Sequence, residues 1–157
     1  MTTHTAFFYG TLMAPQVLHR VCHGPLANSI HAIHNLKTTP AILPDHRRHR
    51  VKNADYPAVL PHQESTVRGT CVTGLTDADI WRLDLFEGDE YKRVKVRCRL
   101  LADGNDDGGE EVEAETYVWT AGEDRLEAKE WDFEEFRREK LRFWAGKDHG
   151  AGEFAGE

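Results

Sequence analysis

The stretch that most constrains the fold of this chain is a helical segment that ends at a glycine and leads directly into a strand. Thr76 is placed to cap the start of the helix, and Asp79 three residues later completes a capping-box pattern. Gly88 is the residue type expected where a helix ends with positive φ. Apolar side chains then alternate from Tyr91 to Leu101, as they do in a half-buried strand. The sequence therefore predicts a helix and a strand joined by a short turn.

Glu87 occupies an unfavourable place for a carboxylate in this helix. It falls on or beside the helical stripe that carries the apolar Ile80 and Leu83. It also lies at the C-terminal end, where the helix dipole disfavours a negative charge by roughly 0.3–1 kcal/mol. Desolvation would add to this penalty. Glu87 is therefore either a half-exposed residue that reaches water or a group whose raised proton affinity is used in chemistry.

The strand that begins at Tyr91 is predicted to form an antiparallel hairpin with a second strand from Val112 to Trp119. Both segments alternate apolar and polar residues, and the polar, glycine-rich stretch from Asp103 to Gly109 separates them. A further strand is predicted from Val67 to Leu75, just before the helix. Gly69 within it indicates a bulge or the close approach of another segment.

Each end of the chain is predicted to carry a helix. Near the N-terminus, a strand from Thr5 to Tyr9 breaks at Gly10 and precedes a helix with Pro15 in its first turn. The buried side of that helix is predicted to consist of Val17, Leu18, Val21 and Cys22. Near the C-terminus, Asp132 is placed to cap a last helix. Its apolar face is predicted to consist of Phe133, Phe136, Leu141 and Trp144.

The segment from Ser29 to Leu60 carries weaker signals. Short apolar runs at Ala41–Leu43 and Ala58–Leu60 lie among prolines, which cannot donate to a strand ladder, so short or edge strands are predicted here. The basic run from His46 to Lys52 is predicted to be a solvated loop, because the domain is acidic and shows no nucleic-acid motif. If this run is functional, it would accept an anionic substrate or partner.

Length and charge restrict the class of protein. The 157 residues suit one domain with one core. We place it at residues 5–145 and expect a flexible tail at residues 146–157, which is rich in Gly, Ala and Glu. Twenty basic and 27 acidic residues give a net charge of −7, which disfavours binding to nucleic acid or to anionic membranes. No segment approaches the roughly 20 apolar residues of a membrane span. No large exposed apolar face is evident, so we expect a monomer.

No metal site, cofactor site or secretory signal is predicted. The histidine pairs lack a third ligand and are interpreted as solvated; they are His19 and His23, His31 and His34, and His46 and His49. The turn at 103–108 matches the start of an EF-hand loop, but Ala114 stands where a bidentate Glu is needed. The N-terminus shows no signal peptide. The three widely spaced cysteines, Cys22, Cys71 and Cys98, are typical of reduced thiols in a cytoplasmic protein.

The turn at Gly10 supplies a possible half of an acyl-transfer site. It contains a single glycine and matches no nucleotide-binding loop. Successive N–H groups at the end of a strand can nevertheless bind a carboxylate or an oxyanion. No Ser, Cys or Lys lies in a nucleophile motif. A lone Glu combined with such N–H groups suits a reaction in which the substrate brings its own nucleophile.

Four short motifs in order resemble those of the γ-glutamylcyclotransferase-like superfamily, and most of all its AIG2-like branch, which includes γ-glutamylamine cyclotransferases. They are Phe8-Tyr-Gly-Thr-Leu12, Tyr56-Pro-Ala-Val59, Val67-x-Gly69 and Leu83-Asp-x-Phe-Glu-Gly-x-x-Tyr-x-Arg93. The resemblance covers about Phe7 to Trp119. It implies an α+β fold, a small mixed β-barrel with flanking helices, on which we expect the C-terminal helix to pack.

The resemblance also implies an activity. Members of the family, which belong to the acyltransferase or carbon–nitrogen lyase type, close a γ-glutamyl group into 5-oxoproline and release an amine or peptide. No cofactor takes part. Carried over to this chain, Glu87 matches the catalytic acid/base, and Tyr9, Gly10, Thr11 and Leu12 match the loop that grips the glutamyl group. Tyr117 matches an aromatic residue of the pocket. Tyr91 and Arg93 match the motif that follows, with a structural role.

Two alternatives stay open at the level of sequence. Glu90 is a second acidic residue near the end of the helix; we expect it to enter the following strand and face away from the site. The fold does not settle the function, so the pocket could serve another amide or ester, or a non-catalytic binding or stress-response module. A cyclotransferase mechanism further requires the Glu87 carboxylate to lie about 5–8 Å from the turn at Gly10.

Overall fold

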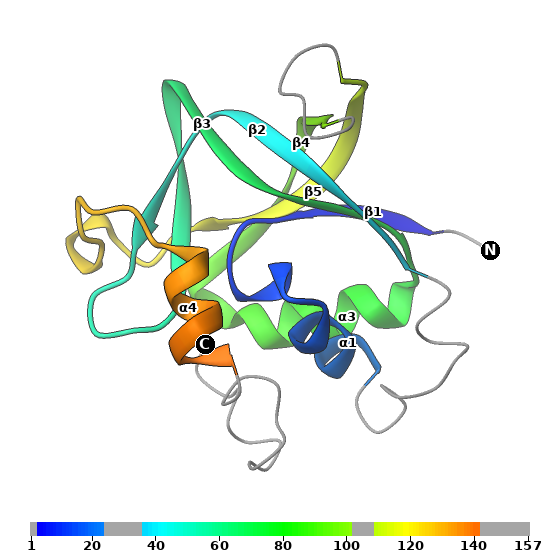
Figure 1. Cartoon of the computed structure of the whole chain (residues 1–157), viewed down its shortest axis with the longest axis horizontal. Helices are drawn as coiled ribbons and strands as arrows, with labels where there is room; N and C mark the ends of the chain where they lie inside the picture. Colours follow the sequence, from blue (N-terminus) through cyan, green and yellow to red (C-terminus); the bar gives the residue numbers. More distant parts are fainter. Residues whose placement is uncertain (1–2, 24–35, 102–108, 142–157) are drawn as a thin grey trace.

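The computed structural model describes residues 3–23, 36–101 and 109–141, and its centre is a closed barrel of five strands (Figure 1). The strands are β1 (His4–Phe8), β2 (Lys37–Arg50), β3 (Pro57–Leu75), β4 (Tyr91–Leu100) and β5 (Glu111–Trp119). Their order around the barrel is β1-β3-β2-β4-β5. Ala6 of β1 and Glu115 of β5 form a parallel pair that closes the barrel, whereas the other neighbours are antiparallel. The predicted mixed barrel is thereby confirmed.

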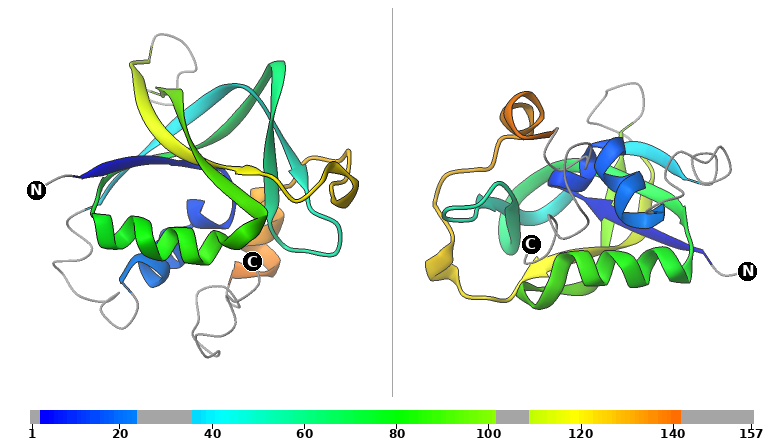
Figure 2. Two further views of the ribbon diagram at one scale, coloured as in Figure 1. Left: turned by 180° about the vertical axis from the view of Figure 1, so that it is seen from behind. Right: turned by 90° about the horizontal axis from the view of Figure 1, so that it is seen from below.

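Three α-helices and three short 3-10 turns lie outside the barrel in the described part of the chain. They are η1 (Thr11–Met13), α1 (Pro15–His23), α3 (Asp77–Glu87), η3 (Gly88–Glu90), η4 (Glu123–Arg125) and α4 (Phe133–Glu139). Figure 2 shows α1 beside α3 at one end of the barrel and α4 on another side. The guanidinium of Arg82 on α3 donates to the carbonyl oxygen of Cys22 on α1 over 2.6 Å. Among the described residues, no helix is both long and apolar enough to cross a bilayer.

The helix that ends near Glu87 forms as predicted. The Thr76 hydroxyl accepts from the backbone N–H of Asp79, and the Asp79 carboxylate accepts from that of Thr76, which completes the capping box. Gly88 follows with φ of 73°, a conformation that residues with a Cβ rarely adopt. One turn of 3-10 helix then leads into β4 at Tyr91. The hairpin of β4 and β5 also agrees with the prediction, since Tyr91 pairs with Trp119.

The prediction of short strands between residues 37 and 60 is wrong, whereas its alternative, an edge strand, agrees with the limited pairing of β2 with β4. β2 runs for 14 residues and β3 for 19, and the two pair antiparallel from Lys37 opposite Thr73 to Arg50 opposite Pro57. β4 pairs with β2 only around Ala41. Most of the edge of β2 that faces away from β3 therefore needs no backbone N–H donor. A strand tolerates proline at such an unpaired edge.

The prediction of a solvated loop from His46 to Lys52 is also wrong. Residues up to Arg50 continue β2, opposite the start of β3. Arg48 within this run is only 8% exposed. Its burial is possible because backbone carbonyls from distant parts of the chain accept its hydrogen bonds.

The core consists of two apolar clusters, and alternate residues of β1 belong to different ones. Phe7 lies in the cluster that draws on all five strands and fills the barrel. Ala6 and Phe8 lie in the cluster between the barrel and the helices. That second cluster includes Val17, Leu18 and Cys22 from α1, Ile80, Leu83 and Phe86 from α3, and Phe136 from α4. All three cysteines are buried and free.

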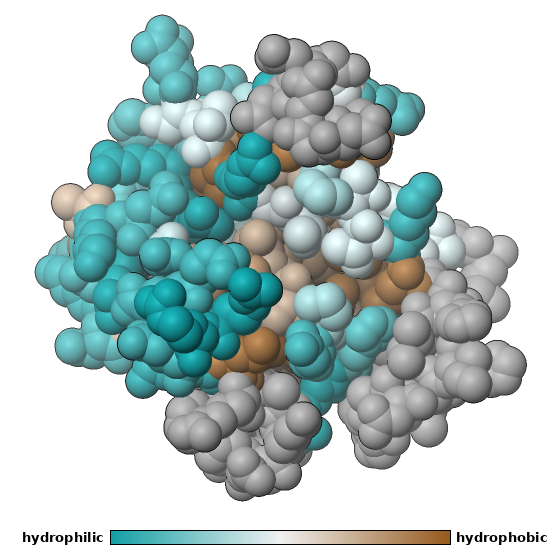
Figure 3. Space-filling view, viewed as in Figure 1, coloured by the Kyte–Doolittle hydropathy of each residue, from teal (hydrophilic) through white to brown (hydrophobic). Residues whose placement is uncertain are grey.

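The surface combines a mostly hydrophilic face with a small apolar patch elsewhere. Figure 3 shows apolar atoms chiefly in a recess of the hydrophilic face. On α3, however, Trp81 and Leu85 are 62% and 63% exposed, one helical turn apart.

Some predictions concern residues outside the described ranges. They are the hairpin turn, the tail from residue 146, His31, His34 and Trp144.

Candidate active site

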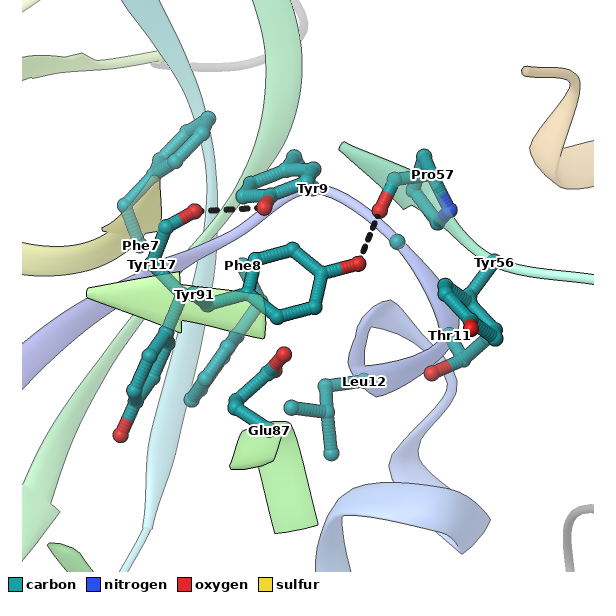
Figure 4. Close-up of a pocket in the computed structure, with 11 residues that line it drawn as sticks. Phe7, Phe8, Tyr9, Thr11, Leu12, Tyr56, Pro57, Glu87, Tyr91 and Tyr117 are labelled. Atoms are coloured by element: carbon teal, nitrogen blue, oxygen red, sulfur yellow. Dashed lines mark hydrogen bonds between the residues drawn. The ribbon is translucent and has the colours of Figure 1, made fainter. Parts of the chain in front are cut away.

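One pocket brings together every residue that the sequence analysis assigned to the site. Its lining consists of Phe7, Phe8, Tyr9, Gly10, Thr11, Leu12, Tyr56, Pro57, Glu87, Tyr91 and Tyr117 (Figure 4). The space between these side chains is about 330 Å³, part of it open to solvent. The geometry places the residues together, and the role of each stays a prediction.

The loop from Tyr9 to Leu12 lines this pocket. It follows β1 and turns into η1, in which the N–H of Met13 donates to the carbonyl oxygen of Gly10 over 2.9 Å. The first N–H groups of a helical turn have no acceptor within the turn. Those of Thr11 and Leu12 are in this position. The loop is therefore a candidate site for a carboxylate or an oxyanion.

Gly10 is required by the close approach of Pro57. A Cβ atom at Gly10 would lie 2.6 Å from Cγ of Pro57 and 2.7 Å from its Cδ. Pro57 is itself held in place, because the hydroxyl of Tyr91 donates to its carbonyl oxygen over 2.7 Å. The start of β3 therefore packs directly against the loop after β1, and only a residue without a side chain fits between them.

We expect Gly10→Ala to lower the free energy of unfolding by about 1–3 kcal/mol, because the added methyl group overlaps the proline ring. Urea unfolding of the variant and the parent protein measures this change. The control is the same substitution in a Pro57→Ala background, which lacks the ring atoms that the methyl group would meet. The loss should be smaller there. An equal loss in both backgrounds would contradict the proposed contact.

Glu87 points its carboxyl group from the end of α3 into the pocket, between Tyr91 and Leu12 (Figure 4). The residue as a whole is half-buried. Burial of the carboxyl group is the main cause that raises the pKa of Glu87, and the negative charge of Asp84 one turn earlier adds to it. Together they raise this pKa from 4.5 to about 8. Such a group can both accept and donate a proton near neutral pH.

Tyr9 and Tyr117 form one wall of the pocket. The Tyr9 hydroxyl donates to the carbonyl oxygen of Tyr117 over 2.5 Å. The Tyr117 hydroxyl points away from the pocket and donates to the Asp84 carboxylate over 2.8 Å. Arg93 binds both oxygens of that carboxylate, at 3.1 and 3.0 Å. Arg93 thus lies outside the lining and holds Asp84, in keeping with the structural role expected for it.

Five lining residues had no assigned role in binding, namely Phe7, Phe8, Tyr56, Pro57 and Tyr91. Two of them, Tyr56 and Pro57, belong to the sequence motif Tyr56-Pro-Ala-Val59, which could have pointed to them. Their contact with the turn at Gly10 joins residues far apart in sequence, which local patterns do not reveal. Tyr91, for which only a structural role was expected, both holds Pro57 and lines the pocket.

Glu90, the rival acid, is engaged elsewhere. One of its carboxylate oxygens lies 2.5 Å from the Arg125 guanidinium, and the other accepts from the Tyr56 hydroxyl over 3.4 Å. It belongs to η3 and precedes β4, so the expectation that it enters the strand is wrong. It does not line the pocket. Glu87 is the only carboxylate among the described residues that do.

Within residues 3–23, 36–101 and 109–141, no group of three or more His, Cys, Asp or Glu side chains is placed to hold a metal ion. The predicted loop of EF-hand appearance at 103–108 lies outside this range.

Comparison with known proteins identifies the family of this chain. Residues 6–133 match the model of the family described as gamma-glutamyl cyclotransferase, AIG2-like. AIG2-like protein D of Arabidopsis thaliana is 37% identical over 138 residues, 88% of this chain and 82% of that protein.

Solved structures extend the comparison to the fold. A solution structure of an Arabidopsis thaliana protein is 31% identical, with a TM-score of 0.65, and the match covers 88% of this chain and 74% of the other. A structure named gamma-glutamyl cyclotransferase shares the fold at 14% identity, with a TM-score of 0.58, over 80% of this chain and 69% of the other. The resemblance inferred from the motifs is confirmed: this chain belongs to the AIG2-like gamma-glutamyl cyclotransferase family.

Proposed function

We propose that this protein is a γ-glutamyl cyclotransferase-type enzyme in which Glu87 is the general base and then the general acid. The observation that carries the proposal is the Glu87 carboxyl group, with its raised pKa, in one small pocket with the turn at Gly10. Membership of the family supports the type of reaction. The proposed catalytic unit is residues 5–145, and the family match to residues 6–133 supports this extent.

The reaction balances with one carboxyl group. The ionised Glu87 takes a proton from the α-ammonium of the substrate, and the freed amine attacks the γ-amide carbonyl carbon of the same molecule. The new C–N bond closes the five-membered ring and leaves a negative charge on the carbonyl oxygen. When this intermediate collapses, the original amide C–N bond breaks and its nitrogen takes the proton from Glu87. The ring nitrogen still carries two hydrogens, and the ionised Glu87 takes one of them and passes it to the released amine, which leaves as an ammonium. The products are 5-oxoproline and an amine or peptide, and Glu87 is again ionised.

The rest of the pocket would supply binding and orientation. N–H groups from Gly10 to Leu12 would hold the α-carboxylate of the substrate or stabilise the developing oxyanion. The aromatic walls made by Tyr9 and Tyr117 would keep the glutamyl chain curled, so that its amine lies against its own carbonyl carbon. Attack within one molecule gains much of its rate from this arrangement.

A panel of γ-glutamyl compounds tests the proposal. It should contain glutathione, γ-glutamyl amino acids and γ-glutamyl-ε-lysine, and the measurement is 5-oxoproline released over time. We expect release from at least one compound and none when the α-amine of that compound is acetylated. Cleavage without 5-oxoproline would indicate an enzyme for another amide or ester. Binding without any cleavage would indicate a non-catalytic module and would overturn the proposal.

A further inference from the structure

Arg48 is a buried basic residue that the mechanism above does not use. It lies on β2 opposite Val59, and its side chain is 9% exposed. Its guanidinium donates to the carbonyl oxygen of Tyr9 over 2.6 Å and to that of Arg68 over 3.2 Å. The ring of Trp131, in the segment before α4, lies 5.7 Å from the guanidinium carbon. Three distant segments of the chain therefore meet at this side chain.

The carboxylate beside Arg48 is a weak partner. Glu130 accepts from the guanidinium over 3.3 Å, and its own side chain is 62% exposed. Burial of a charge is unfavourable unless good partners surround it, and an apolar residue often gives equal or greater stability at such a place. The shortest hydrogen bond of Arg48 is the one to the backbone carbonyl oxygen of Tyr9. Stability alone is thus a poor explanation for a guanidinium here.

The Tyr9 carbonyl belongs to the same peptide unit as the N–H of Gly10. A trans peptide is planar, so its C=O and N–H bonds point in opposite directions. The described residues contain no cis peptide bond. A bond that fixes the carbonyl towards Arg48 therefore also fixes the Gly10 N–H, which must point away from Arg48. Gly10 lines the pocket of Glu87, whereas Arg48 lines a different cleft, with Met13 and Trp131.

We propose that Arg48 is a positioning residue that turns the N–H of Gly10 towards the anionic group of the γ-glutamyl substrate. The role rests on the function proposed above. The positive charge also polarises the peptide that it binds, because a charged donor on the C=O strengthens the bond that the N–H of that peptide can make. Arg48 does not touch the substrate and acts only through the Tyr9–Gly10 peptide.

Kinetics of Arg48 variants in the full chain test this inference. We expect Arg48→Met to lower kcat/KM by roughly 10–100-fold, because a misplaced donor loses much of its effect. Arg48→Lys should keep part of the activity, since an ammonium can still donate to the Tyr9 carbonyl. The matched control is Arg50→Met on the same strand, whose side chain is 38% exposed and pairs with Glu127. It should leave kcat/KM unchanged.

Two readouts separate positioning from a merely structural role. The apparent pKa in the pH–rate profile, set by Glu87, should stay the same in Arg48→Lys, because Arg48 acts on the loop and not on that carboxyl group. NMR spectra of the unliganded Arg48 variants and of the unliganded parent protein give the second readout. Between variant and parent, the amide signal of Gly10 should shift more than the amide signals of residues in α3. If Arg48→Met does not fold, the same two measurements on Arg48→Lys decide the question.

The outcomes distinguish this inference from the proposed function. An active parent protein whose Arg48→Met variant keeps kcat/KM within about twofold overturns the positioning role. An activity loss that matches only the unfolded fraction, with the Gly10 amide signal unchanged, also overturns it. A parent protein that releases no 5-oxoproline from any compound of the panel overturns the function itself. In that case the Gly10 signal still shows whether Arg48 orients the peptide.

Discussion

Replacing Glu87 with Gln is expected to lower kcat for 5-oxoproline release by about 10²–10⁴-fold, the contribution typical of a general acid–base. The amide side chain fills nearly the same space, but it cannot take the proton of the α-ammonium. The measurement is product release from the best compound of the panel at pH 7.5, together with urea unfolding to show that the variant is folded. A loss of activity in a fully folded variant would identify Glu87 as the proton carrier.

The control for this experiment is the same substitution at the neighbouring acid. Glu90→Gln removes a carboxylate that pairs with Arg125 outside the pocket lining, so kcat should stay close to that of the parent protein. Full activity in Glu87→Gln would rule out the assignment. A loss confined to Glu90→Gln would instead make Glu90 the base and would require a different path to the substrate.

The parts of the site that the sequence predicted depend on local chemistry. Thr76, Asp79 and Gly88 specify where the helix begins and ends through contacts within a few residues, so the position of Glu87 at its C-terminal end follows from the sequence. The break of β1 at Gly10 is a local signal of the same kind. Both signals are independent of how the barrel closes.

The parts that the sequence missed depend on partners far along the chain. Arg48 lies in a run of basic residues that has the composition of a solvated loop, and the carbonyl oxygens of Tyr9 and Arg68, which accept its hydrogen bonds, lie far from it in sequence. In the same way, the prolines of β2 indicate short or edge strands, and the length of β2 does not follow from them. The limited pairing of β2 with β4 removes the need for donors, and the order of strands in the barrel cannot be inferred from local patterns.

Glu87 should also make the folded protein less stable as pH rises. Its pKa is raised from 4.5 to about 8 in the folded state, chiefly by burial. The folded protein therefore holds this proton more tightly than the unfolded chain does. The resulting stabilisation is fully present below pH 4.5 and is lost as pH rises through about 8.

We accordingly expect Glu87→Gln to equal the parent protein in free energy of unfolding near pH 4 and to exceed it by ~2 kcal/mol at pH 9. One pKa unit corresponds to about 1.4 kcal/mol, and the figure counts only about half of the shift because the residue is half-buried. Urea unfolding of both proteins at several pH values measures the difference. Parallel curves for Glu87→Gln and the parent protein would mean that folding does not change the pKa of the Glu87 carboxyl group. A growing difference would show that this chain keeps, at the end of α3, a carboxyl group that lowers its stability at alkaline pH, as expected of a residue retained for proton transfer.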